Sequence, residues 1–125
     1  MPVTFEVIHQ ESYYHATWTG LLTAEELLES YKTFFNSNQW VPGYNSFVDL
    51  SNLNAKCLIT KGVIALASLV ERTFKPHNIN PKTAVFAPDD LPFGLSRMYS
   101  PYVESFETYL TFRDKETALK WLKED

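Results

Sequence analysis

Polar and apolar residues alternate along the first part of the chain, and this period of two predicts two strands. Every second residue of 5–9 lies on one face, and the same holds for residues 14–18. A two-residue turn at Glu11-Ser12, or a four-residue loop of the same parity, would pair Phe5 with Trp18. Either connection places the apolar positions of both strands on one side. The alternation therefore predicts an antiparallel hairpin at the start of the fold.

Apolar residues next recur at helical spacing behind a capping box. Thr23 can accept a hydrogen bond from a first-turn amide, and Glu26 can reach back to the amide of Thr23. The stripe that follows predicts a helix that begins at Ala24 and ends near Asn36 to Asn38. A second helix is expected behind Thr60, its candidate N-cap.

Aspartates introduce the two helices expected in the second half of the chain. Asp90 is the predicted N-cap of the third helix and Asp114 that of the fourth. Pro101 should end or kink the third helix near Ser100, because its ring removes a backbone donor and clashes with the preceding turn.

Three more segments are predicted to be strands: Ser46–Leu50, Thr83–Ala87 and Phe106–Phe112. Residues 51–54 are polar and are expected to form a loop. The order ββαβαβαβα predicts an α/β fold, a single domain over residues 1–125. It has a mainly parallel five-stranded sheet, right-handed crossovers and an N-terminal antiparallel hairpin.

Charge, hydropathy and cysteine content disfavour nucleic-acid binding, a membrane span and cysteine-based cross-links. The net charge of −4 disfavours nucleic acid, which is held chiefly by Lys and Arg. No apolar run approaches the roughly 20 residues that span a bilayer, and no basic-then-apolar leader opens the chain, so a cytoplasmic location is expected. A single cysteine, Cys57, excludes an internal disulfide and a cysteine zinc site, and its apolar neighbours predict a buried side chain.

Two stretches carry a resemblance to a known family. Thr83–Tyr99 and the ending Phe112–Leu122 resemble the STAS-like (anti-sigma-factor antagonist-like) family, which includes many uncharacterised bacterial proteins. Phe47–Ser51 and the capping-box helix fall in the matching order. The resemblance implies a STAS-like right-handed β/α superhelix and a regulatory role through protein partners.

One feature of the best-known branch of that family is changed in this chain. The anti-sigma-factor antagonists carry Asp-Ser-Ser-Gly where the second helix begins, and a kinase phosphorylates a serine there. Residues 57–62 contain no serine, and Thr60 is the nearby hydroxyl. Thr60 is therefore the candidate phospho-acceptor, and a simple helix cap is the alternative.

A candidate ligand or partner surface follows from the topology, because ligands of open α/β sheets sit beyond the carboxyl ends of parallel strands. Residues expected near that edge are Asp49, Ser51, Asp89, Asp90, Phe93, Arg97 and Tyr99. Aspartate at turns and helix starts is usually structural, so an enzyme using these carboxylates is disfavoured.

The sequence lacks the motifs of nucleophilic hydrolases, nucleotide-binding proteins and metal sites. Neither Gly-x-Ser-x-Gly nor an obvious Cys/His pairing is present, and the four glycines are isolated, so no nucleotide loop is predicted. The hairpin places His9 and His15 on opposite faces, and His77 lies far along the chain. We therefore expect no catalysis, no cofactor and no metal.

The favoured function is a non-catalytic regulatory or protein-interaction module. A homodimer is expected, because helices gathered on one face would leave the other poorly covered, with Tyr13, Trp18 and Trp40 as candidates for the exposed side or its rim. The alternative is a binder of a small apolar or amphipathic, lipid-like molecule. That ligand would lie between the second and third helices, near the carboxyl ends of the parallel strands.

Overall fold

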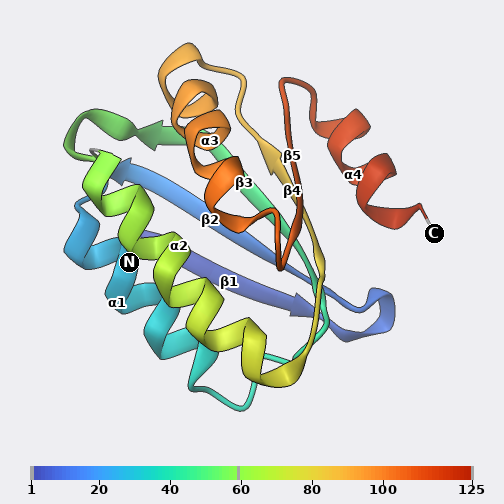
Figure 1. The fold of residues 1–125 in the computed structure, drawn as a ribbon. Helices are drawn as coiled ribbons and strands as arrows, with labels where there is room; N and C mark the ends of the chain where they lie inside the picture. Colours follow the sequence, from blue (N-terminus) through green and yellow to red (C-terminus); the bar gives the residue numbers. More distant parts are fainter. Residues whose placement is uncertain (1, 59, 125) are drawn as a thin grey trace.

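Five strands form one sheet in chain order in the computed structural model, which describes residues 2–58 and 60–124 (Figure 1). The strands are β1 (Val3–Ile8), β2 (Tyr13–Leu21), β3 (Asn45–Asn54), β4 (Lys82–Phe86) and β5 (Thr108–Phe112). The helices are α1 (Ala24–Phe35), α2 (Thr60–Phe74), α3 (Asp90–Val103) and α4 (Lys115–Lys123), with 3-10 turns at His9–Glu11, Ala55–Cys57 and Lys75–His77. The β1–β2 pair is antiparallel and the other pairs are parallel, which confirms the predicted fold class.

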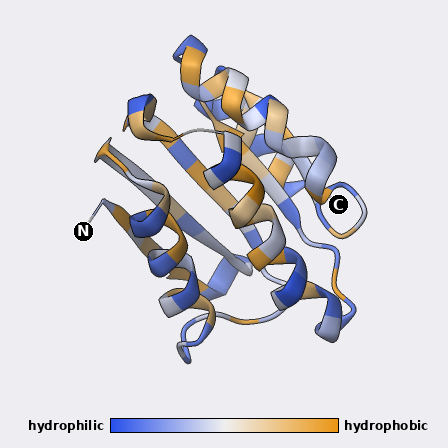
Figure 2. Cartoon of the chain, turned by 60° about the vertical axis from the view of Figure 1, so that its left-hand side comes forward, coloured by the Kyte–Doolittle hydropathy of each residue, from blue (hydrophilic) through white to orange (hydrophobic). Residues whose placement is uncertain are grey.

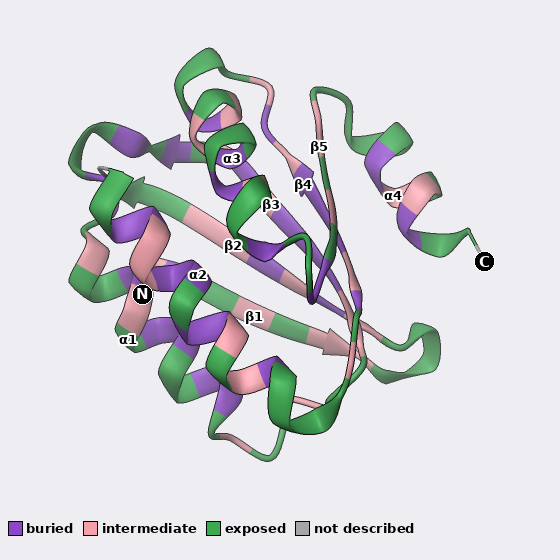
Figure 3. Ribbon diagram, viewed as in Figure 1, coloured by how far each residue is buried: buried purple, intermediate pink, exposed green. Residues whose placement is uncertain are grey.

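Helices cover both faces of the sheet, but unequally. The chain-order sheet places α1, α2 and α3 on one face, while α4 packs on the other against β3 and β4 (Figure 1). Apolar bands lie on the sheet-facing sides of the helices, and the outward sides are polar and exposed (Figures 2 and 3). Two buried clusters result, a large one under α1–α3 and a small one under α4. No helix in the described part of the chain is long and apolar enough to cross a membrane.

The hairpin forms with the predicted faces but a different register. Val3, rather than Phe5, lies opposite Trp18. A 3-10 turn at His9–Glu11 and a left-handed Ser12 close the connection as a four-residue loop. Because the shift is two residues, no side chain changes face, and Val3 enters the core at 3% exposed.

The capping box is confirmed. The Thr23 amide donates to Glu26 Oε1 at 3.0 Å, and the Glu26 amide donates to Thr23 Oγ1 at 3.2 Å. Asp114 caps α4 as predicted, accepting a 2.9 Å hydrogen bond from the Thr117 amide.

The predicted start of α3 is one residue late. Asp89 is the N-cap residue, and α3 begins at Asp90, whose carboxylate pairs with Arg113 Nη1 at 2.8 Å. Pro101 does not end the helix, which continues to Val103. Val103 is 0% exposed, so its burial holds the last turn on the core despite the missing backbone donor.

The start of α2 also differs from the prediction. The helix begins at Thr60 itself, so Thr60 is not its N-cap, and the residue before it lies outside the described residues. In the first turn, a Cβ on Gly62 would come within 2.7 Å of the Ala24 Cβ. Glycine at this position therefore permits the close approach of α2 to α1.

The predicted polar loop after β3 is wrong, because β3 continues to Asn54. A bulge between Thr17 and Thr19 of β2 shifts the register, and pairing then resumes from Asn52. Leu53, buried at 8% exposed, anchors this extension to the core.

Trp18 and Trp40, which were expected on an exposed side of the sheet or its rim, pack against the main core instead. The indole N–H of Trp18 donates to the Tyr31 hydroxyl at 3.1 Å, on the α1 face of the sheet. Trp40 stacks on Phe74 with ring centroids 6.0 Å apart. Tyr13 lies on the opposite face, packed against the small cluster under α4. Both indoles reach apolar partners in the main core, so they are not part of an uncovered surface.

Candidate functional site

A polar row crosses the sheet beneath α1–α3, near the amino ends of β2, β3, β4 and β5. Strand pairing sets Tyr14 beside Ser46, Ser46 beside Thr83, and Thr83 beside Tyr109. The alternation of the strands points all four side chains toward the helices. Ser46 and Thr83 are buried but small, so the centre of the row leaves space between the two tyrosines.

Glu107 enters this space from the residue before β5. Its side chain is 5% exposed, and one oxygen, Oε1, accepts a hydrogen bond from the Thr83 hydroxyl. The other oxygen, Oε2, has no partner among the described residues. Burial raises the pKa of Glu107 to about 7, and the hydrogen bond from Thr83 opposes part of that rise.

The space around Glu107 belongs to a cavity of about 60 Å³ between the sheet and the helices α1, α2 and α3. Its lining includes Trp18 and Leu53 as well as Tyr109. The helix side is mostly apolar and includes Val63, Leu66 and Val70 of α2 and Leu95 of α3.

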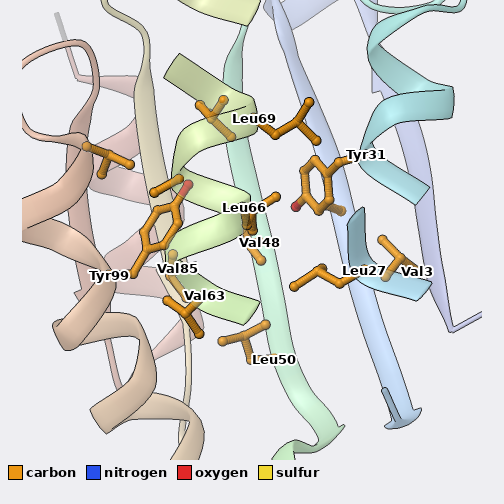
Figure 4. Packing of buried hydrophobic residues seen from close by; sticks show 14 of the residues in the cluster. Val3, Leu27, Tyr31, Val48, Leu50, Val63, Leu66, Leu69, Val85 and Tyr99 are labelled. Carbon is orange, nitrogen blue, oxygen red and sulfur yellow. The ribbon is translucent and has the colours of Figure 1, made fainter. Parts of the chain in front are cut away.

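Aromatic hydroxyls add to the polar lining. The hydroxyls of Tyr31 and Tyr99 point toward each other across the space over Val48 and Leu66 (Figure 4). The Tyr99 ring lies 5.1 Å from that of Tyr109. Burial raises the pKa of both Tyr31 and Tyr99 well above its ordinary value, and the nearby Glu107 carboxyl adds to the rise, so both side chains are neutral.

Ser96 links α3 to β5 by hydrogen bonds at the edge of the cavity. Its hydroxyl lies 2.6 Å from both the Tyr109 hydroxyl and Thr111 Oγ1. These bonds fix the Tyr109 ring against α3, and burial raises the pKa of Tyr109.

The sheet separates Asp49 and Ser51 from this cavity. Asp49 pairs with Phe86 and points to the α4 face, where Oδ1 accepts bonds from the Ser51 amide at 2.9 Å and the Ser51 hydroxyl at 2.6 Å. These two predicted site residues therefore form a local turn-like contact and do not meet those of α3.

Four other predicted site residues lie at the N-cap and along the first two turns of α3. They are Asp89, Asp90, Phe93 and Arg97. The guanidinium of Arg113 lies 4.0 Å from the centroid of the Phe93 ring, and that of Arg97 lies 5.8 Å away. Only Tyr99, of the seven predicted surface residues, lines the cavity.

Thr60 and Cys57 lie at the surface. Thr60 is exposed at the first position of α2. Cys57 was expected to be buried, but it is exposed at the end of the 3-10 turn Ala55–Cys57. In that turn the apolar side chain that enters the core is Ala55, at 4% exposed.

Sequence reasoning missed Glu107, Thr83 and Ser46 as site residues. The available signal was the alternation of the last strand, since Glu107 shares a face with Tyr109 and Thr111. A sequence does not reveal that this face points to the core. The cavity does lie beneath the second and third helices, as the ligand hypothesis expected. Its polar groups, however, lie at the amino ends of the strands rather than at their carboxyl ends.

Comparison with solved structures identifies the fold. An uncharacterized protein from the DUF3478 family with a SpoIIAA-like fold, from Shewanella loihica, matches with a TM-score of 0.58 and 17% sequence identity. The match covers 96% of this chain and 91% of the other. The fold is SpoIIAA-like. This confirms the STAS-like architecture predicted from the sequence, and at this identity the likeness concerns the fold alone. No family model and no curated protein matches the chain.

Proposed function

We propose that the protein binds a small, mostly apolar molecule with one polar end in the cavity beneath α2 and α3. The observation that carries the proposal is the buried Glu107 carboxyl, whose Oε2 has no partner among the described residues and lies in a mostly apolar cavity. A buried acceptor left without a hydrogen bond costs about 1–3 kcal/mol. A ligand donor at Oε2 removes that cost, and the apolar lining stabilises the rest of the molecule.

The cavity volume limits the ligand. A cavity that holds benzene measures about 150 Å³, and one water needs about 10–15 Å³. The volume of about 60 Å³ is less than half that of the benzene cavity, so it fits a few waters or a molecule of about four non-hydrogen atoms, and not a six-membered ring. A short alkyl chain of about two or three carbon atoms meets this limit. The proposed activity is binding, without a chemical step.

A cavity-filling variant tests the proposal. Leu66 and Leu69 are buried residues of α2, and only Leu66 lines the cavity. Leu66→Phe should abolish the rise in melting temperature produced by methanol, ethanol or 1-propanol, whereas Leu69→Phe should keep it. Absence of any rise in the wild-type protein with all three alcohols would overturn the proposal, since waters alone would then fill the cavity.

A second candidate function is the protein-interaction module expected from the sequence. Supporting it, α3 carries large apolar side chains that remain exposed: Leu91 at 55%, Met98 at 46% and Tyr102 at 51%. Exposed apolar residues gathered on one helix often mark a contact with another protein. The test is whether Leu91→Ser with Met98→Ser removes binding of partners that co-purify with the wild-type protein while leaving its melting temperature unchanged.

A further inference from the structure

We infer that the polar end of the ligand is a protonated primary amine, paired with the Glu107 carboxylate inside the cavity. The inference rests on the proposed function and specifies the chemical class of the ligand. It follows from the charges that line the cavity, from the tyrosine rings beside Glu107 and from the small residues around it.

The lining favours a cation and disfavours an anion. Among the described residues that line the cavity, none is Lys, Arg or His, and Glu107 is the only carboxyl group. The remaining ionisable groups are tyrosines, which are neutral because burial raises their pKa values. A ligand carboxylate or phosphate would face a buried acid with no cation to neutralise either group.

An ammonium group fits better than an alcohol because it satisfies charge as well as hydrogen bonding. A neutral hydroxyl could donate to Oε2 but would leave the ionised Glu107 without an opposite charge in a buried site. An ammonium donates three hydrogen bonds, and a charge-assisted bond to a carboxylate is roughly twice as strong as a neutral one.

The surroundings of Glu107 also suit a small cation. Tyr14, Tyr99 and Tyr109 line the same cavity, and aromatic rings within about 6 Å attract cations. Ser46 and Thr83 are the small residues of the polar row, and they leave room for a primary ammonium beside the carboxyl. The apolar side chains of α2 then cover the carbon chain of the ligand.

Binding of an amine is coupled to the protonation of Glu107. The titratable groups facing Glu107 are Tyr14 from β2, Tyr31 from α1, Tyr99 from α3 and Tyr109 from β5. Their pKa values lie above the physiological range, and the lining residues of α2, β3 and β4 do not titrate. Glu107 is therefore the group whose protonation competes with the amine, so affinity for the amine falls as the pH drops below 7.

Three probes of equal chain length test the inference: propylamine, 1-propanol and propanoate. Titration calorimetry at pH 8 compares them on the wild-type protein, on Glu107→Gln and on Glu104→Gln. Glu104 is an exposed residue at the end of α3, so its variant removes the same charge from the surface. Glu107→Gln keeps the shape of the side chain and removes the acid.

We expect propylamine to bind the wild-type protein and Glu104→Gln at least about tenfold more tightly than 1-propanol. Glu107→Gln should lose that preference while binding 1-propanol within about threefold of wild type. If 1-propanol binds as tightly as propylamine, or if propanoate binds most tightly, the ligand is not an amine, although the cavity proposal still holds. If none of the three probes binds the wild-type protein, both proposals fail.

Discussion

The Thr83 hydroxyl donates a hydrogen bond to the Glu107 carboxyl group in the interior of the protein. The bond joins β4 to the residue before β5, and it leaves the second carboxyl oxygen facing the cavity. An acid buried this way has a pKa raised to about 7, so the stability of the fold should depend on its protonation.

Replacing Glu107 with Gln should change how stability varies with pH. The folded-state pKa lies near 7 and the ordinary value is 4.5, so the folded protein binds the extra proton between these values. Stability from this group is therefore fully present below pH 4.5 and is lost as the pH rises through 7. In urea unfolding, the free energy of unfolding of the wild-type protein should fall by about 3 kcal/mol relative to that of Glu107→Gln between pH 4.5 and pH 8.

The comparison must be made against Glu107→Gln because His15 acts in the opposite direction. Burial lowers the pKa of His15, so its contribution to stability is lost as the pH falls. Parallel pH profiles for wild type and Glu107→Gln would contradict the buried, titrating carboxyl.

Thr83→Val should raise the pKa of Glu107 and destabilise the fold. Valine keeps the shape of threonine but removes the donor that lowers the pKa of Glu107. A lost hydrogen bond to a buried group should cost about 1–3 kcal/mol, measured by urea unfolding at pH 7.5. Thr108→Val, at an exposed residue bonded to Asn80, is the control and should have little effect. Equal effects of the two variants would refute a special role for the Thr83 bond.

The sequence predicted the order and type of the elements because the periodicities and caps act locally. The bonds of Thr23 with Glu26, and of Asp114 with Thr117, join residues three apart and can be read from the chain. The ends of elements depend on distant partners and were predicted less well. Asp90 pairs with Arg113 and leaves the cap position to Asp89.

The candidate site could not be predicted for the same reason. Glu107 meets Thr83 across 24 positions of sequence, and the meeting depends on the parallel pairing of β4 with β5. The expected grouping of Asp49 with Arg97 failed because alternation along β3 turns Asp49 to the opposite face. A strand's inward face is decided by packing, which the local pattern of an edge strand does not specify.

The two helix starts should respond differently to alanine. Thr23→Ala removes a confirmed cap and should cost about 1 kcal/mol in urea unfolding. Asp90→Ala removes an exposed ion pair and no capping bond, so its effect should be distinctly smaller. A cost for Asp90→Ala equal to that for Thr23→Ala would restore Asp90 as the functional cap of α3.

We expect the protein to form a homodimer through the edge of the sheet at β5. Leu110 on this edge strand is 47% exposed, and an open edge with an apolar side chain favours pairing with another strand. Light scattering should show a dimer at high micromolar concentration, and Leu110→Lys should convert it to a monomer. Leu21→Lys, at an exposed leucine at the end of β2, is the control and should leave the dimer intact. A strict monomer for the wild-type protein would remove the prediction.

Phosphorylation at Thr60 is predicted to change partner binding without unfolding the helix. Thr60 is the exposed first residue of α2, and the first turn contains no acidic residue. Two negative charges there would face the positive end of the helix dipole, with Lys61 adjacent. Thr60→Glu should therefore leave the melting temperature nearly unchanged and weaken the binding of a partner that contacts residues 55–58 and the first turn of α2.

Ser68→Glu, two turns further along the exposed side of α2, is the control for Thr60→Glu. It adds the same charge and should bind the partner normally. Two results together would contradict a regulatory role for Thr60: normal partner binding by Thr60→Glu, and an unmodified Thr60 in phosphoproteomic data from the native host.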